Sequence, residues 1–124
     1  MTYSVILIED NKMNSRLTQK VLESAGYNVS QFNSAEAALD QIKTIQPHVI
    51  LLDLQLPGIS GYDFARQVRR FDQFKNIPLV AISANVREED KNQAFDSGCD
   101  GFIDKPVNTR TLAEEIQSYI EAKS

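Results

Sequence analysis

Several residue types are scarce in this chain of 124 residues, which has one cysteine (Cys99), one histidine and no tryptophan. A lone cysteine cannot form an internal disulfide, which favours a reducing compartment. No apolar run approaches the roughly 18–20 residues that span a membrane. The amino-terminal MTYSVILIED also lacks the basic start and the apolar length of a signal peptide. We therefore expect a cytoplasmic protein that does not enter a membrane.

Positive charge is scarce as well, because 13 lysines and arginines face 17 acids and the net charge is −4. Affinity for nucleic acid depends mainly on neutralising phosphates, so this balance argues against a nucleic-acid binder. No linker, repeat or low-complexity segment interrupts the chain, and its length is typical of one domain. We expect one domain over residues 1–124, with no attached effector domain.

Five short segments have the length and composition of β-strands. They are Ser4–Ile8, Tyr27–Phe32, His48–Asp53, Ile77–Ser83 and Gly101–Asp104. The third is apolar on both faces, which is typical of a strand in the middle of a parallel sheet.

Helical patterns separate these strands. The first has Met13, Leu17, Val21, Leu22 and Ala25 at helical spacing before Gly26. The second is capped by Ser34, has Ala35, Ala38, Leu39, Ile42 and Ile45 on one face, and ends at Pro47. A loop with Pro57, Gly58 and Gly61 leads to the third, whose inward residues are Phe64, Ala65, Val68 and Phe71. A weaker helix over Glu88–Ser97 ends at Gly98, and Asn108 or Thr109 caps the last, with Leu112, Ile116, Tyr119 and Ile120.

Five strand–helix units in tandem predict an α/β fold, a parallel sheet with helices on both faces. Ligands of such sheets bind beyond the carboxyl ends of the strands. Those ends carry three carboxylates, a hydroxyl and an amine: Glu9, Asp10, Asp53, Ser83 and Lys105.

Carboxylates gathered at one edge repel each other, by about 4 kcal/mol for two charges 4 Å apart at an effective dielectric constant near 20. A divalent cation relieves this repulsion, and oxygen ligands suit Mg²⁺ or Mn²⁺. An aspartate beside such a metal can attack phosphorus and form an aspartyl phosphate. Lys105 can neutralise the transferred oxygens, and Ser83 can donate a hydrogen bond to one of them.

Four motifs occur in order at these strand ends: E-D-N, L-L-D-L-Q-L-P-G-I-S-G around Asp53, A-I-S-A, and D-K-P. Together they make the whole chain resemble the receiver domain of two-component response regulators. The D-N-x-x-N stretch of Asp10, Asn11 and Asn14 is similar to receivers of the DivK type and to those of hybrid histidine kinases. The resemblance implies the flavodoxin-like fold, with strand order 2-1-3-4-5.

The resemblance also implies roles for the metal-site residues. Asp53 matches the phosphoacceptor, Asp10 a direct metal ligand, and Glu9 the acidic partner that usually binds metal-bound water. Gln55 matches the position that offers its backbone carbonyl to the metal, and its side chain is similar to those that tune dephosphorylation.

Three further residues match the family's transfer and switching positions. Lys105 matches the lysine that pairs with the phosphoryl oxygen, and Pro106 next to it implies a cis peptide bond. Ser83 and Phe102 match the hydroxyl and aromatic residues of the switch. In the family, their movement reshapes the face made by the fourth helix, the fifth strand and the fifth helix.

These roles predict a stand-alone signalling switch rather than an enzyme, although Asp53 would carry intrinsic self-phosphorylation and autodephosphorylation chemistry. A histidine kinase or a histidine phosphotransfer protein would phosphorylate Asp53 with Mg²⁺, or with Mn²⁺. The altered face would then bind a downstream protein or relay the phosphate. We expect a monomer.

Three alternatives differ from this switch. A degenerate receiver would bind partners without phosphorylation, although all its key positions are filled here. A phosphohydrolase would show D-x-D after the first strand and a cap domain. A flavin or nucleotide carrier needs a Gly- or Ser/Thr-rich loop after that strand, where this chain has the acidic EDNKMNS.

Overall fold

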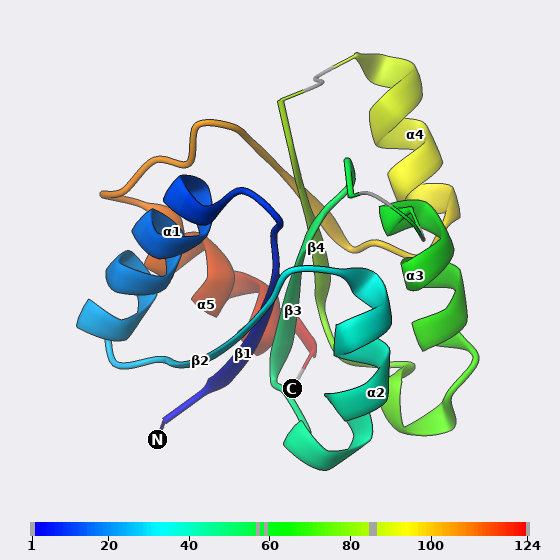
Figure 1. Ribbon diagram of the computed structural model, residues 1–124, viewed down its shortest axis with the longest axis horizontal. Helices are drawn as coiled ribbons and strands as arrows, with labels where there is room; N and C mark the ends of the chain where they lie inside the picture. The colour runs from blue at the N-terminus through cyan, green and yellow to red at the C-terminus, as the bar shows by residue number, and fades with distance from the viewer. Residues whose placement is uncertain (1, 57, 59, 85–86, 124) are drawn as a thin grey trace.

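The apolar runs of the sequence form one five-stranded parallel sheet (Figure 1). Its strands are β1 (Ser4–Ile8), β2 (Asn28–Phe32), β3 (Val49–Asp53), β4 (Leu79–Ser83) and β5 (Gly101–Asp104). Their order is β2-β1-β3-β4-β5, which confirms the predicted order. The computed structural model describes residues 2–56, 58, 60–84 and 87–123.

Alternating side chains of each central strand enter two separate cores, because successive residues of a strand point to opposite faces. Val5 and Leu7 of β1 pack on one face, and Ile6 and Ile8 pack on the other. All five residues of β3 are buried, which confirms its predicted place in the middle of the sheet.

Five helices cover the two faces. They are α1 (Lys12–Ser24), α2 (Ala35–Ile45), α3 (Gly61–Arg69), α4 (Glu88–Asp96) and α5 (Leu112–Lys123), and a short 3-10 helix (Asp72–Phe74) follows α3. Residues of α1 and α5 pack in one core, and residues of α2, α3 and α4 pack in the other. Figure 1 shows these two helix layers on either side of the sheet.

Helix α3 begins earlier than the sequence predicts. Ser60 caps it by accepting a hydrogen bond from the backbone N–H of Asp63, so Gly61 is the first helical residue and not part of the loop. A Cβ atom on Gly61 would lie 2.7 Å from Cα of Leu54 and 2.9 Å from the carbonyl oxygen of Asp53. Glycine is therefore needed here for close approach. Pro57 of the predicted loop lies outside the described residues.

The apolar residues that recur at helical spacing on α1 are only partly buried. Met13 is 82% exposed and Leu17 is 44% exposed, whereas Ser15, Thr18 and Leu22 are buried. The helical spacing is correct, but nothing in the described structure covers the amino-terminal part of this apolar stripe.

Smaller differences concern the ends of elements. Strands β2 and β3 begin one residue later than predicted and β4 begins two residues later, while Phe71 lies beyond the end of α3, partly buried against the core. Ser34 caps α2 as predicted, and Asn108 accepts a hydrogen bond from Arg110 in the turn before α5. Within the described part of the chain, no helix combines the length and the apolar character that crossing a membrane requires.

Candidate functional site

An ion-paired group of three side chains lies at the carboxyl edge of the sheet. Glu9 follows β1, Asp53 ends β3 and Lys105 follows β5. Nζ of Lys105 lies 2.8 Å from Oε1 of Glu9 and 3.0 Å from Oδ2 of Asp53. Asp53 is only 3% exposed and Glu9 is 5% exposed, so one lysine compensates two buried carboxylates.

Asp10 and Gln55 border this group. Carboxylate oxygens of Glu9, Asp10 and Asp53 all lie within 4.8 Å of one another, and Asp10 is exposed. The backbone N–H of Gln55 donates a 2.9 Å hydrogen bond to Oδ1 of Asp53. The two oxygens of Asp53 are therefore held by different donors, Gln55 at Oδ1 and Lys105 at Oδ2.

The two buried acids differ in their affinity for a proton. Burial, followed by the neighbouring Asp53 carboxylate, raises the pKa of Glu9 to about 7. Burial alone would also raise the pKa of Asp53, but its contacts with Glu9, Gln55 and Lys105 favour the anion and lower it. Lys105 is kept protonated, since burial would lower its pKa but its hydrogen bonds to both acids raise it. The site therefore favours the anion at Asp53 and the proton at Glu9.

The donor set suits a hard divalent cation. Oε2 of Glu9 is buried and has no hydrogen-bond partner, and an unpaired buried oxygen of this kind is costly. With the oxygens of Asp10 and Asp53 close by, it belongs to a cluster of oxygen ligands of the type that Mg²⁺ and Mn²⁺ prefer. The residues therefore fit the metal that the sequence predicts.

Ser83 lies on β4, next to β3, and Phe102 lies on β5, the edge strand beyond β4. Ser83 ends β4, is buried, and follows Ile82, the register partner of Asp53. Phe102 lies within β5 and is partly buried against the core beneath α2, α3 and α4. Nζ of Lys91, on α4, lies 5.7 Å from the centre of its ring. The peptide bond between Lys105 and Pro106 is cis, which confirms that prediction.

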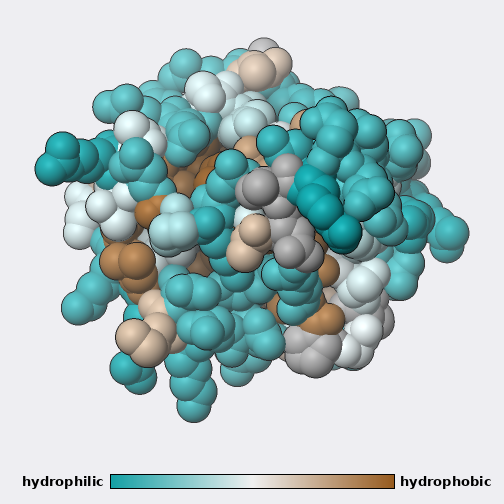
Figure 2. Space-filling model, turned by 90° about the horizontal axis from the view of Figure 1, so that it is seen from above, coloured by the Kyte–Doolittle hydropathy of each residue, from teal (hydrophilic) through white to brown (hydrophobic). Residues whose placement is uncertain are grey.

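A small cleft opens beside Asp53 toward α1. Besides the ion-paired group, it is lined by Asn14, Leu17 and Thr18 of α1 and by Pro106 and Val107. Figure 2 shows this end of the molecule as mainly hydrophilic, with small hydrophobic groups on the left, the side of α1 in Figure 1. Of these lining residues, the sequence argument named Asn14 only for its motif and missed the role of Leu17, Thr18 and Val107. Helical periodicity places Leu17 and Asn14 one turn apart, but it does not show which helix face borders the site.

A doubly covered five-stranded parallel sheet with this acid–lysine group at its carboxyl edge defines the receiver class of proteins. The chain belongs to the response regulator receiver domain family, whose pattern it matches over residues 5–117. Members of this family are the switches of two-component signalling.

Named relatives support this assignment. The polar-differentiation response regulator DivK of Brucella ovis is 32% identical over 120 residues, which cover 97% of this chain and 98% of that protein. The chemotaxis response regulator CheY4 of Vibrio cholerae has a TM-score of 0.91 at 25% identity, covering 96% of this chain and 99% of that one. The receiver domain of the sensor histidine kinase PA1611 of Pseudomonas aeruginosa PAO1 has a TM-score of 0.90 at 26% identity, covering 98% and 99%. It was crystallised with a magnesium ion in its active-site cleft.

Proposed function

We propose that this chain is a phosphorylation switch whose acceptor is Asp53, phosphorylated by a histidine kinase or a histidine phosphotransfer protein. The observation that carries the proposal is the environment of Asp53. It is a buried carboxylate with a lowered pKa, oriented by Gln55 and Lys105, at the open edge of the sheet. An ionised carboxylate with fixed oxygens is prepared to act as a nucleophile.

The transfer requires few groups. An Asp53 oxygen attacks the phosphorus of a phosphohistidine, the P–N bond breaks as the O–P bond forms, and the imidazole leaves with the electron pair. Lys105 pairs with an oxygen of the transferred group, and Ser83, at the end of the adjacent strand, donates a hydrogen bond to another. Asp10, Asp53, the Gln55 carbonyl and, directly or through water, Glu9 would hold Mg²⁺, which would supply the remaining positive charge; Mn²⁺ would suit the same oxygens.

Phosphorylation then changes the face made by α4, β5 and α5. The phosphoryl group brings close to two negative charges to a site that already contains three carboxylates. The arrangement that brings Ser83 and Lys105 closest to it is favoured, and Phe102 turns inward in response. The similarity to DivK over 97% of this chain and 98% of that protein supports an output through the surface of the receiver itself. Its output is a protein contact or onward phosphotransfer.

The phosphodonor protein contacts the exposed part of α1. Met13 and Leu17 offer apolar surface there, and Leu17 itself lines the cleft beside Asp53. Lys12, Arg16 and Lys20 recur every fourth residue on α1 and form no ion pair with another described residue. A donor that delivers its phosphohistidine to Asp53 through the cleft would contact both the apolar and the basic surface of α1.

Mass spectrometry after treatment with a small phosphodonor and Mg²⁺ tests the proposal. We expect one labile phosphoryl adduct, absent from Asp53→Asn and present in the matched control Asp104→Asn, which changes an exposed acid at the end of β5. An adduct on His48 or Ser83 would refute the assignment of Asp53. A wild-type protein that never acquires an adduct would instead be a binding module that works without phosphorylation.

A further inference from the structure

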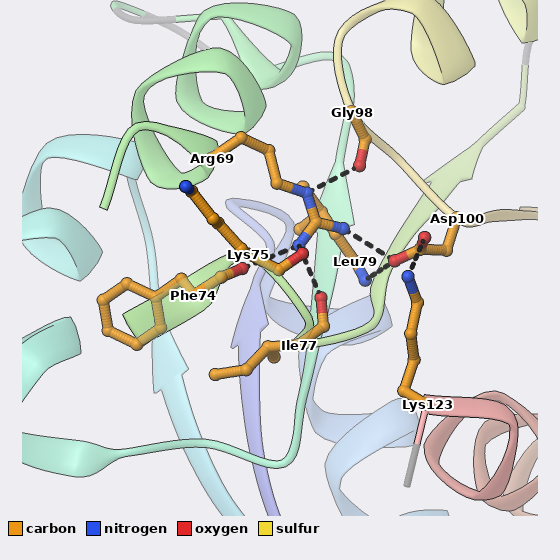
Figure 3. A network of polar contacts seen from close by, with 8 residues as sticks. All are labelled: Arg69, Phe74, Lys75, Ile77, Leu79, Gly98, Asp100 and Lys123. Carbon is orange, nitrogen blue, oxygen red and sulfur yellow. Dashed lines mark hydrogen bonds and ion pairs between the residues drawn. The ribbon is translucent and has the colours of Figure 1, made fainter. Parts of the chain in front are cut away.

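A second charged cluster lies at the opposite end of the sheet from Asp53, and Arg69 is its centre (Figure 3). Arg69 is the last residue of α3, and its side chain is 18% exposed. Its guanidinium donates hydrogen bonds to four backbone carbonyls, those of Gly98 (2.9 Å), Phe74 (2.8 Å), Lys75 (3.2 Å) and Ile77 (2.7 Å). One side chain thus joins α3, the segment before β4 and the turn after α4.

Asp100 connects this cluster to β4, β5 and α5. Its Oδ2 accepts hydrogen bonds from Arg69 at 2.6 Å and from the backbone N–H of Leu79 at 3.0 Å, while its Oδ1 lies 3.0 Å from Nζ of Lys123. Its own backbone N–H donates to the carbonyl of Leu79. The amino ends of β4 and β5 are therefore fixed to each other and to the carboxyl end of α5. We call Arg69, Gly98 and Asp100 the clamp.

The carboxyl end of α4 is fixed within the clamp. Gly98 has φ of +114°, and the N–H groups of Gly98 and Cys99 donate to the carbonyls of Phe95 and Ala94. This pattern is the Schellman motif, which closes a helix rigidly. A Cβ atom on Gly98 would lie 2.7 Å from Cγ of Arg69, so the turn and the arginine fit against each other closely.

The amino-terminal half of α4 has far weaker attachments. Among the described residues, Arg87 forms ion pairs with Glu89 and Asp90 of the same segment. Arg87 and Asp90 also interact electrostatically with Tyr62 of α3, but Ala94 is the one residue of α4 that is buried. Toward β5, this half makes a cation–π contact between Lys91 and Phe102. Such a contact at an exposed site contributes little stability.

We propose that the clamp is the pivot of α4. When Asp53 is modified, the amino-terminal end of α4 and the Lys91–Phe102 contact move, while the end at Gly98 stays in place. Arg69 is then a positioning residue, since it never touches the phosphoryl group but determines which end of α4 can respond. This inference deepens the proposed function and rests on it for the trigger, whereas the difference between the two ends of α4 exists without any trigger.

Distances between spin labels test the pivot. One label is attached at Asp40→Cys on α2 and the other at Glu89→Cys or Asp96→Cys, at the two ends of α4. Burial raises the pKa of the Cys99 thiol to about 12, which protects it from the label. On adding beryllofluoride and Mg²⁺, we expect the distance to residue 89 to change by about 2 Å and the distance to residue 96 to stay constant. Equal displacement at both positions would overturn the proposal.

A variant of Arg69 tests whether this residue holds the carboxyl end of α4 in place. Arg69→Lys keeps the charge but loses the planar fork that reaches several carbonyls. We expect both distances to change in this variant, whereas the matched control Arg66→Lys, on the exposed side of the same helix, should behave as the wild type. An Arg69→Lys protein that keeps residue 96 in place would contradict the role of Arg69.

Hydrogen exchange of the unmodified protein separates failure of the pivot from failure of the proposed function. Without any phosphoryl mimic, the backbone amides of residues 97–99 should exchange much more slowly than the helical amides of residues 91–93, and Arg69→Lys should accelerate residues 97–99 about tenfold. If beryllofluoride does not bind, the proposed function fails while this gradient still supports the clamp. A flat exchange profile along α4 would overturn the pivot whether or not beryllofluoride binds.

Discussion

Glu9 combines two properties that rarely occur in one side chain, deep burial and an oxygen without a hydrogen-bond partner. Lys105 binds its other oxygen, but the same lysine also compensates Asp53. One positive charge for two buried carboxylates leaves the metal-free site with an excess of negative charge, and Glu9 can remove that excess by taking up a proton. The proton and the cation therefore compete for the same oxygen atoms.

The stability of the metal-free protein should fall as pH rises from about 5 to 7. The pKa of Glu9 is about 7 in the folded protein and 4.5 in the unfolded reference, so in this window only the folded state retains the proton. Unfolding then releases it, and each pH unit lowers the free energy of unfolding by up to about 1.4 kcal/mol. Urea denaturation in EDTA between pH 5 and 8 measures this slope.

The variant Glu9→Gln tests whether Glu9 causes this slope, because a glutamine side chain cannot titrate. Its stability should lack this component of the slope and exceed that of the wild type at pH 8. The control Glu114→Gln changes an exposed glutamate of α5 and should keep the wild-type slope. Identical slopes in wild type and Glu9→Gln would mean that Glu9 is already ionised in the folded protein at pH 5.

At the scale of elements, the approach of α3 to the end of β3 determines how tightly the site is enclosed. Gly61→Ala would press a methyl group against the backbone of Asp53 and Leu54, neither of which can rotate away. We expect a loss of about 1–3 kcal/mol in the free energy of unfolding, as for other overpacked sites. Urea denaturation measures it.

The same variant should also bind Mg²⁺ more weakly, because the displaced backbone carries Asp53. Ser60→Ala is the comparison, since it removes the cap of α3 without adding volume and should cost about 1 kcal/mol with little effect on Mg²⁺. If Gly61→Ala is as stable as the wild type, the start of α3 can shift at no cost.

Sequence patterns predicted the bounds and the burial of elements well where local composition determines them. They predicted them poorly where contacts with other elements determine them. The bounds of β1 and β5 are as predicted, because an apolar run ends abruptly at polar residues. Strand β4 starts later than its apolar run, since Pro78 has no N–H and the Ile77 carbonyl accepts from Arg69 instead of a strand. Periodicity showed the stripe of Met13 and Leu17 on α1 but could not show whether anything covers it.

The candidate site was predictable to a similar degree. The rule that parallel strands end at one edge brought Glu9, Asp53 and Lys105 together, and their roles beyond that geometry stay predictions. The clamp was not predictable, since Arg69 and Asp100 lie 31 residues apart. Nothing in the sequence distinguishes them from other charged residues at the surface. Only the fold reveals that the carbonyls at the ends of several elements converge on one guanidinium.

At the scale of the whole molecule, metal binding should stabilise the entire fold. The ligands come from the ends of β1 and β3, so the unfolded chain offers no preformed site. At ten times its dissociation constant, Mg²⁺ should add about 1.4 kcal/mol and raise Tm by about 5 °C. Asp10→Asn should abolish most of this shift, and without Mg²⁺ it should melt at a higher temperature than the wild type because one repelling charge is gone.

Thermal melts with and without Mg²⁺ measure both effects. The control Asp40→Asn alters an exposed acid of α2, far along the chain from the site, and should respond to Mg²⁺ as the wild type does. A full Mg²⁺ shift in Asp10→Asn would remove Asp10 from the metal site.

The order in which the residues of the ion-paired group are synthesised has a consequence for signalling. Lys105 follows Glu9 by 96 residues and Asp53 by 52 residues, and it is delivered by the edge strand that is made last. Until then, burying both acids without a cation would be strongly unfavourable. A nascent chain that lacks Lys105 therefore needs a proton on Glu9 or a bound divalent cation to bury both acids. Under the proposed function, it also lacks the lysine that pairs with the transferred oxygens. The complete ion-paired group therefore exists only once β5, the last strand of the sequence, has joined the sheet.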